Sequence, residues 1–142
     1  MSWSENYASN DGEIVRRWAV IEQRMGDLCT VFRDLQLSRN ATEVARTIGV
    51  STAHGLDSEL RRRRLPPYRS LRNWYLVVIF VDRSLFDRSL CQLALNLAVD
   101  PSTLYRLARG VTGHTWTEVR ALGPQWCRAQ ALSAWRAHLG DI

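Results

Sequence analysis

The chain has 142 residues, of which 46% are hydrophobic and 23% are charged, and its formal net charge is +5. This length and composition suit one compact body of one or two small lobes and exclude a largely disordered chain. The positive charge favours an anionic partner, most simply nucleic acid, although basic proteins also meet membrane surfaces and acidic proteins. All 19 basic residues are arginine, which suits paired contacts to phosphate and guanine, although a genomic codon bias would give the same count.

The ends and the cysteines give no sign of export, of a membrane span or of a metal site. The first residues, MSWSENYASNDGE, lack the basic start and apolar run of a signal peptide. The longest apolar run, residues 75–81, is far shorter than the roughly 20 residues that a membrane span needs. Cys29, Cys91 and Cys127 are too scattered for a disulfide framework or a metal motif, so we expect reduced, mostly buried thiols. We therefore expect a cytoplasmic protein without a membrane partner, a cofactor or a metal.

The first part of the chain predicts one long helix. Its polar start is expected to be frayed, with Asn10 or Asp11 capping the helix that follows. From residue 13 the apolar residues form a heptad seam: Ile14, Trp18, Ile21, Met25, Leu28, Phe32 and Leu35. The seam either packs on the rest of the body or joins two copies as a homodimer, with Arg17 and Glu22 pairing between parallel partners. Gly26 costs about 1 kcal/mol relative to alanine, so packing must hold this segment together.

Two stretches of the chain match each other. Residues 89–109 (SLCQLALNLAVDPSTLYRLAR) have the spacing of a helix-turn-helix, in which Asp100 caps the second helix and Pro101 begins it without losing a hydrogen bond. Residues 40–64 repeat the pattern at an offset of 49, which falls to 48 beyond Ser51 because the first copy carries one extra residue. The matched pairs are Asn40 with Ser89, Val44 with Leu93, Ala45 with Ala94, Ile48 with Leu97, Gly49 with Ala98, Val50 with Val99, Ser51 with Asp100, Leu56 with Leu104, Leu60 with Ala108, Tyr68 with Trp116, Leu71 with Val119 and Arg72 with Arg120. Two aligned copies rarely arise by chance, so the duplication is the most specific signal in the sequence.

Helix-start signals also match between the copies. The first helix of each copy opens with a predicted capping box, in which a cap and the residue three positions on exchange hydrogen bonds. The boxes are Asn40 with Glu43 and Ser89 with Gln92. The second helices are expected to begin at Ser51 and Asp100.

Between the copies, the spacing predicts a helix over residues 66–83. Its two prolines end the previous helix and start the next, and apolar residues then recur for about four turns. Residues 76–81 could also be a buried strand because β-branched residues crowd there, but no second strand exists to pair with it. A helix of about 16 residues would span roughly 24 Å and hold two lobes in a defined orientation.

The last segment, residues 124–139, predicts a helix that closes the second lobe or pairs with the N-terminal helix. The tryptophans at helical spacings are read as core anchors, not as stacking platforms for bases. No catalytic triad, paired carboxylates or glycine-rich phosphate loop stands out, so we expect no enzyme. The expected fold is all-α, with two helix-turn-helix lobes joined by a long linker helix. The segments are 1–37, 38–65, 66–83, 84–123 and 124–142.

The two copies and the helix between them resemble the DNA-binding region of the AraC/XylS family of bacterial transcription regulators. The likeness covers residues 38–123 and is best in ALNLAVDPSTLYRLARGVTGHTWTEVRALG, with its trailing Gly113 and Arg120. The resemblance implies that two recognition helices enter successive major-groove segments on one side of the duplex. It also implies a stand-alone regulator without a ligand-binding domain, with double-stranded DNA as its partner and RNA polymerase as a further candidate.

The candidate DNA-binding residues lie on the outer faces of the two second helices. With Leu104, Leu107 and Ala108 turned inward, the second copy presents four side chains outward. These are Ser102, Tyr105, Arg106 and Arg109. In the first copy the candidates are Thr52, Ser58, Arg61 and Arg62, within an arginine run that either is solvated or holds phosphates.

A competing interpretation is a degenerate helix-turn-helix scaffold that never touches DNA. It would bind another protein, or self-associate through the heptad seam. Asp57 and Glu59 favour this interpretation because carboxylates that face phosphate are repelled. The second copy argues against it.

Overall fold

The computed structural model describes residues 3–35, 37–86 and 89–142, although the side chains of residues 3–10 and 37 lie outside this description. Its helices are, in chain order, α1 (Trp3–Met25), α2 (Leu28–Arg33), the 3-10 helix η1 (Leu37–Arg39), α3 (Ala41–Thr47), α4 (Ala53–Arg62), α5 (Tyr68–Ser84), α6 (Leu90–Asn96), α7 (Pro101–Thr112), α8 (Trp116–Leu122), α9 (Pro124–Ala134) and α10 (Arg136–Leu139). The described residues contain no β-strand, which confirms the predicted all-α class. None of the described helices combines the length and the apolar character needed to cross a bilayer.

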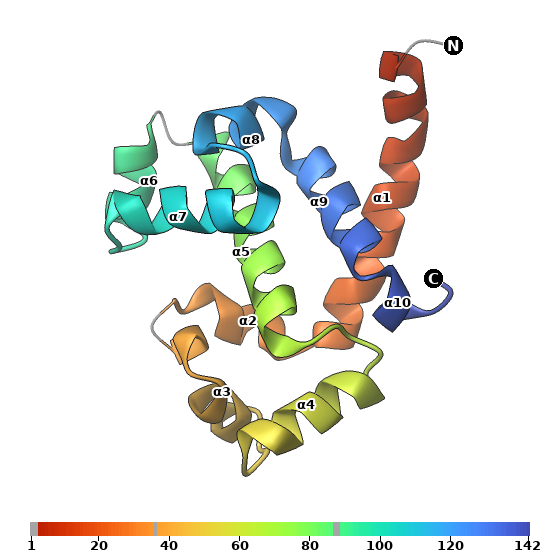
Figure 1. The fold of residues 1–142 in the computed structure, drawn as a ribbon, viewed down its shortest axis with the longest axis vertical. Coiled ribbons are helices and arrows are strands. Elements are labelled where there is room, and N and C mark those ends of the chain that lie inside the picture. Colours follow the sequence, from red (N-terminus) through yellow and green to blue (C-terminus); the bar gives the residue numbers. More distant parts are fainter. Residues whose placement is uncertain (1–2, 36, 87–88) are drawn as a thin grey trace.

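Helix α5 runs through the middle of the molecule (Figure 1). Its buried apolar side chains point in nearly all directions: Leu71, Tyr75, Leu76, Val77, Val78, Phe80 and Val81. A helix that is apolar on nearly all sides must be covered on nearly all sides, and α5 contacts α2, α4, α6, α7, α8 and α9. The helix predicted over residues 66–83 is therefore confirmed with slightly shifted ends. The strand alternative is wrong, because the β-branched residues fill the core around a helix.

Helices α1 and α9 lie side by side and share one aromatic cluster with α5 (Figure 1). Trp18 of α1 stacks on Tyr75 of α5 and on Trp135 at the end of α9, with ring centroids 6.1 and 5.6 Å away. The Arg128 guanidinium of α9 lies 5.7 Å from the centre of the Trp18 ring and pairs with Asp82 of α5 at 2.6 Å. The C-terminal helix thus pairs with the N-terminal helix, one of the two arrangements left open by the sequence, and it also contacts α8.

The N-terminal helix differs from the prediction at both ends. It begins at Trp3, so Asn10 and Asp11 lie inside it and do not cap it. It ends at Met25 because Gly26 takes a φ of +54°, a left-handed conformation that interrupts a helix and that glycine adopts readily. The expectation of one continuous helix through Gly26 is therefore wrong.

The heptad seam packs inside the chain. Five of its residues are buried and two pack at the edge of the same core: Trp18, Ile21, Met25, Leu28 and Phe32, then Ile14 and Leu35. The flanking charges also find partners within the chain, since Arg17 pairs with Glu13 and Glu22 accepts a hydrogen bond from Tyr75. A coiled coil through this seam would require α1 and α2 to leave the core. Of the two roles predicted for the seam, the structure therefore contains packing on the rest of the body.

Two pairs of helices, α3 with α4 and α6 with α7, have matching backbones at their turns. Gly49 and Ala98 occupy the same place in the two turns, with φ of +86° and +56°. In each pair the next residue's N–H then bonds back to a carbonyl five residues earlier. These bonds are Val50 N–H to Ala45 O (2.7 Å) and Val99 N–H to Ala94 O (3.0 Å). The sequence offset of 49 therefore corresponds to a repeated turn.

The predicted caps of α3 and α6 are present, but their capping boxes are incomplete. Asn40 and Ser89 each accept a hydrogen bond from the backbone N–H three residues on, at 3.3 and 3.1 Å. The return bonds are missing because the Glu43 and Gln92 side chains turn to other partners. Those partners are Arg46 and Asn96. A complete capping box forms instead at the start of α8, between Thr115 and Glu118.

The helix that follows each pair is tied back by an arginine. Arg72 of α5 donates to Ser38 Oγ at 3.0 Å, and Arg120 of α8 donates to the Ser84 carbonyl at 3.0 Å. Among the described residues, Ser38 and Ser84 are the polar side chains that are fully buried. Because Arg72 and Arg120 are matched in the sequence alignment, the repeat extends into the third helix of each unit.

The repeated turn gives a matched pair of stability predictions. Replacing Ala98 with glycine is expected to stabilise the fold by about 0.5–1 kcal/mol, because relief of roughly 1–2 kcal/mol of left-handed strain exceeds glycine's entropic cost of about 0.5–1 kcal/mol. Gly49→Ala should destabilise it by a similar amount, through backbone strain alone, since nothing lies within 4 Å of an added Cβ. Urea denaturation measures both. Gly110→Ala inside α7 is the control and should stabilise; a stabilising Gly49→Ala would contradict the turn geometry.

Candidate nucleic-acid interface

Helix α7 forms as its sequence predicts. The Asp100 side chain caps it by accepting from the Ser102 N–H at 2.8 Å, and Pro101 occupies its first position. Its C-terminal end is closed by Gly113 in the left-handed region, with φ of +78°. Leu104 and Ala108 are buried, which holds the opposite side of the helix outward.

All four predicted residues of α7 lie on that outward side. They are Ser102, Tyr105, Arg106 and Arg109, and each is exposed. Arg106 folds back along the helix and donates to the carbonyl and the hydroxyl of Ser102, both at 3.3 Å. The hydrogen bonds from Ser102, with help from the Arg106 charge, lower the pKa of the Asp100 carboxyl. The helix itself contains no acidic residue, so its outer face is cationic.

Helix α4 exposes its predicted residues too, but most of them are engaged within the chain. The expected start at Ser51 is one residue early, because the cap is Thr52, whose hydroxyl accepts from the Gly55 N–H at 3.0 Å. Ser58 donates to a backbone carbonyl one turn back. Among the predicted α4 residues, Arg61 is the one whose side chain makes no hydrogen bond to another described residue.

A close contact accounts for the glycine in α4. A Cβ on Gly55 would lie 2.5 Å from Cγ1 of Val50, in the turn that precedes the helix. Since real side chains do not approach so closely, the turn and α4 can pack as they do only without a side chain at this position. Gly55 is therefore a packing requirement of the first helix pair.

The acidic residue Glu59 is neutralised inside the chain. Its carboxylate accepts hydrogen bonds from Arg62 and Arg63, and these bonds lower its pKa to about 2. Arg63 also donates to the Met25 carbonyl at 2.7 Å and to Asp27 at 2.9 Å, which ties α4 to the turn between α1 and α2. The expectation that Glu59 repels phosphate is therefore not supported. Because Arg62 and Arg63 already have these partners, they are less available to bind phosphate than the arginine run in the sequence suggested.

The Glu59 cluster predicts a pH-dependent difference in stability. Because its folded-state pKa is lowered from 4.5 to about 2, the cluster stabilises the fold above pH 4.5 and loses that contribution as the pH falls toward 2. Glu59→Gln should therefore be less stable than the parent at pH 7, and the difference should shrink as the pH falls from 4.5 to about 2. Urea melts over that range measure it. Glu43→Gln, which removes one exposed pair with Arg46, should show a much smaller effect at pH 7. If the difference in stability between the parent and Glu59→Gln does not change with pH, the assignment of the lowered pKa to Glu59 is contradicted.

Sequence reasoning missed two arginines beside α7. Arg39 of η1 and Arg72 of α5 line a groove of about 370 Å³ together with Arg106. The alignment of Arg72 with Arg120 was a signal for a structural role in the repeat. No sequence signal placed Arg39 and Arg72 next to Arg106, because the groove is formed by elements far apart in the chain.

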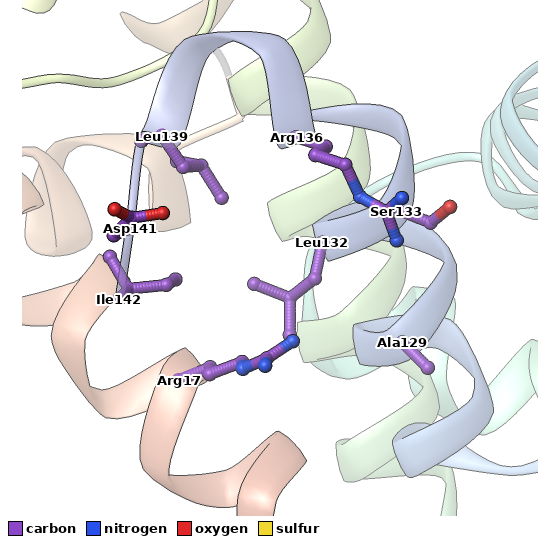
Figure 2. Close-up of a pocket in the computed structure, with 9 residues that line it drawn as sticks. Arg17, Ala129, Leu132, Ser133, Arg136, Leu139, Asp141 and Ile142 are labelled. Atoms are coloured by element: carbon purple, nitrogen blue, oxygen red, sulfur yellow. The ribbon is translucent and has the colours of Figure 1, made fainter.

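A second cavity lies between α1, α9 and α10, away from the predicted interface. Its volume is about 420 Å³, and Figure 2 shows Arg17 reaching across it from α1 toward Leu132 of α9. Arg136 and Asp141 also line it, and Arg17 is already paired with Glu13 at 2.9 Å. The lining of this cavity therefore carries both positive and negative charges, whereas the outer face of α7 carries only positive ones.

The thiols and possible metal ligands remain separate. No group of three or more His, Cys, Asp or Glu side chains that could hold a metal ion occurs in the part of the chain that the structure describes. All three cysteines are free thiols. The expectation of mostly buried thiols holds for Cys127, where burial raises the pKa to about 12, but Cys29 is only half-buried and Cys91 is exposed.

Comparison with known proteins adds no family assignment. No protein-family model matches the chain, and neither does any curated protein or solved structure. The functional interpretation therefore depends on the residues and contacts described above.

Proposed function

We propose that the chain binds double-stranded DNA sequence-specifically and acts as a cytoplasmic transcription regulator of the AraC/XylS kind. In this proposal α3–α4 and α6–α7 are two helix-turn-helix units joined by α5. Their second helices, α4 and α7, enter successive major-groove segments. The observation that carries the proposal is the outer face of α7, where Ser102, Tyr105, Arg106 and Arg109 are exposed on a helix without acidic residues.

The packing supports a fixed relation between the two units. Both α4 and α7 contact α5, whose 17 residues span roughly 25 Å, and Figure 1 shows α4 at the N-terminal end of α5 and α7 crossing beside its middle. Because α5 is buried in the shared core, the units cannot move independently without exposing apolar surface. A rigid pair of reading helices fits a DNA site with two segments.

The two helices are expected to contribute unequally. On α7, Tyr105 and Arg109 make no side-chain hydrogen bond to another described residue and Arg106 bonds only to Ser102 of the same helix, whereas on α4 this freedom is limited to Arg61 among the predicted residues of the described chain. The exposed Asp57 also lowers the affinity of α4 for phosphate. We therefore assign base reading mainly to α7, with α4 adding backbone contacts. RNA polymerase remains a further candidate partner of a regulator of this kind.

A selection from random-sequence duplexes tests the proposal. The full chain should enrich one strong segment, read by α7, and a weaker segment about one helical turn, or roughly 10 base pairs, away. A parallel selection with the Tyr105→Ala variant should change the strong segment and leave the weak one. Enrichment of no sequence above the input would contradict sequence-specific binding.

The competing candidate is a protein-binding scaffold, and exposed apolar side chains favour it. Leu85 and Phe86 follow α5 and Leu95 lies on α6, with exposed fractions of 62%, 88% and 73%. Large exposed apolar residues are common at protein interfaces. The same selection separates the candidates, because a scaffold that does not bind DNA enriches no sequence.

A further inference from the structure

A groove between η1, α5 and α7 combines three arginines from these three elements. Arg39 ends η1, Arg72 lies on α5 and Arg106 lies on α7. The remaining lining is apolar or uncharged: Leu35, Asn73, Leu76, Phe80, Thr103 and Leu107. No carboxylate is among the lining residues, so positive charge accumulates there without a counter-charge in the groove.

Arg72 is held in place by uncharged partners. Its Nε donates to Ser38 Oγ at 3.0 Å and its Nη1 to Asn73 Oδ1 at 3.1 Å, while the Ser38 carbonyl accepts a hydrogen bond from the Tyr68 hydroxyl. Ser38 is fully buried, so this arrangement is rigid. It fixes the Arg72 guanidinium but leaves its charge unbalanced.

The surroundings of Arg72 disfavour its charged form. Burial of the half-buried Arg72 side chain lowers its pKa from the ordinary value, and the neighbouring Arg39 lowers the pKa further. A buried charge without a counter-charge is unfavourable, and an anion in the groove would relieve the cost. Arg106 is partly balanced by Asp100 at the start of α7, and Asp100 does not line the groove.

We infer that Arg39, Arg72 and Arg106 form a clamp for a backbone phosphate of DNA, at the stretch of duplex between the two segments read by α4 and α7. The inference depends on the proposed function. A phosphodiester carries one negative charge and two free oxygens, which match guanidinium donors in pairs. Arg106 belongs both to the reading face and to the groove, so the groove opens beside the surface on which the duplex would lie.

The test uses the full chain and the duplex that the selection enriches. In Arg39→Gln with Arg72→Gln, affinity should fall roughly tenfold and the slope of log affinity against log salt should flatten by about 1, as expected for one lost phosphate contact. Ethylation of single phosphates should interfere with wild-type binding at positions between the two segments. The same ethylations should no longer interfere with the double variant. Arg16→Gln with Arg136→Gln removes equal charge from α1 and α10 and should leave the interference pattern unchanged.

The outcomes separate the clamp from the proposed function. If the wild type binds no duplex, the proposed function fails. If it binds a selected duplex but the groove variant matches the α1/α10 control in affinity and interference pattern, the clamp alone is overturned. If inorganic phosphate shifts the NMR signals of the groove residues while no central ethylation interferes with DNA binding, the groove binds a free anion and the DNA clamp is overturned. Because Arg72 ties α5 to Ser38, the double variant could fail to fold. In that event the single variant Arg39→Gln is used for the same affinity and interference measurements, and a circular dichroism melt checks that it is folded.

Discussion

Replacing both Arg106 and Arg109 with alanine is expected to weaken binding to a selected duplex by roughly 100-fold. Each side chain lies exposed on the cationic face of α7. A guanidinium that pairs with a base edge or a phosphate contributes about 1–3 kcal/mol, and each 1.4 kcal/mol is a factor of about ten in affinity. Fluorescence anisotropy at constant salt measures the loss.

A charge-matched variant separates position from net charge. Arg16→Ala with Arg136→Ala removes the same two charges from α1 and α10, on the side of the molecule away from α7 (Figure 1). It should weaken binding only a few-fold, because the loss of two positive charges reduces the long-range attraction to DNA. Equal losses in the two double variants would show that α7 has no special role. Among the single variants, Arg106→Ala should weaken binding to all sequences alike, as expected for a phosphate contact in the clamp, whereas a preference relaxed at one base position by about 1–3 kcal/mol would show that Arg106 reads a base.

Replacing Trp135 with alanine is expected to lower the free energy of unfolding by about 3–5 kcal/mol. Trp135 is fully buried, stacks on Trp18 at 5.6 Å and donates its indole N–H to Ser70 Oγ at 3.1 Å. Since small domains are stable by only about 5–15 kcal/mol, this one change would remove much of the margin. Guanidinium denaturation followed by circular dichroism measures it.

A second tryptophan provides the comparison for this change. Trp126 is only half-buried and meets His114 edge-on at 5.5 Å, so Trp126→Ala should cost clearly less. Both variants should unfold in one transition, because α1, α5 and α9 share the core. A loss below about 1 kcal/mol for Trp135→Ala would mean that the terminal helices are not part of that core.

The elements that could be predicted were those whose local signals agree with their packing. Helix α7 has a cap, a proline at its first position, inward leucines and a closing glycine, and each has the role that its type suggests. Helix α5 was predictable from its apolar stripe and its prolines. Burial on the remaining sides could not be read from periodicity, because the covering helices come from both ends of the chain.

The errors come from choices that only tertiary contacts decide. Gly26 fits the interior of an imperfect helix as well as a left-handed turn, and the Arg63 contacts with Met25 and Asp27 help to fix the turn. Glu59 is an exception: its partners Arg62 and Arg63 lie three and four residues further along the same helix, so the spacing in the sequence was enough to predict the pairing. The basic groove beside α7 was missed because Arg39 and Arg72 meet Arg106 only after the units pack.

The salt dependence of binding to a selected duplex tests the central proposal most directly. If about six phosphates are neutralised by arginines, log affinity should fall with log salt at a slope near minus five. The slope should be shallower for the Arg106→Ala, Arg109→Ala variant if these side chains contact phosphate. An affinity that stays constant between low and physiological salt would mean that no arginine surface of this chain holds a DNA backbone.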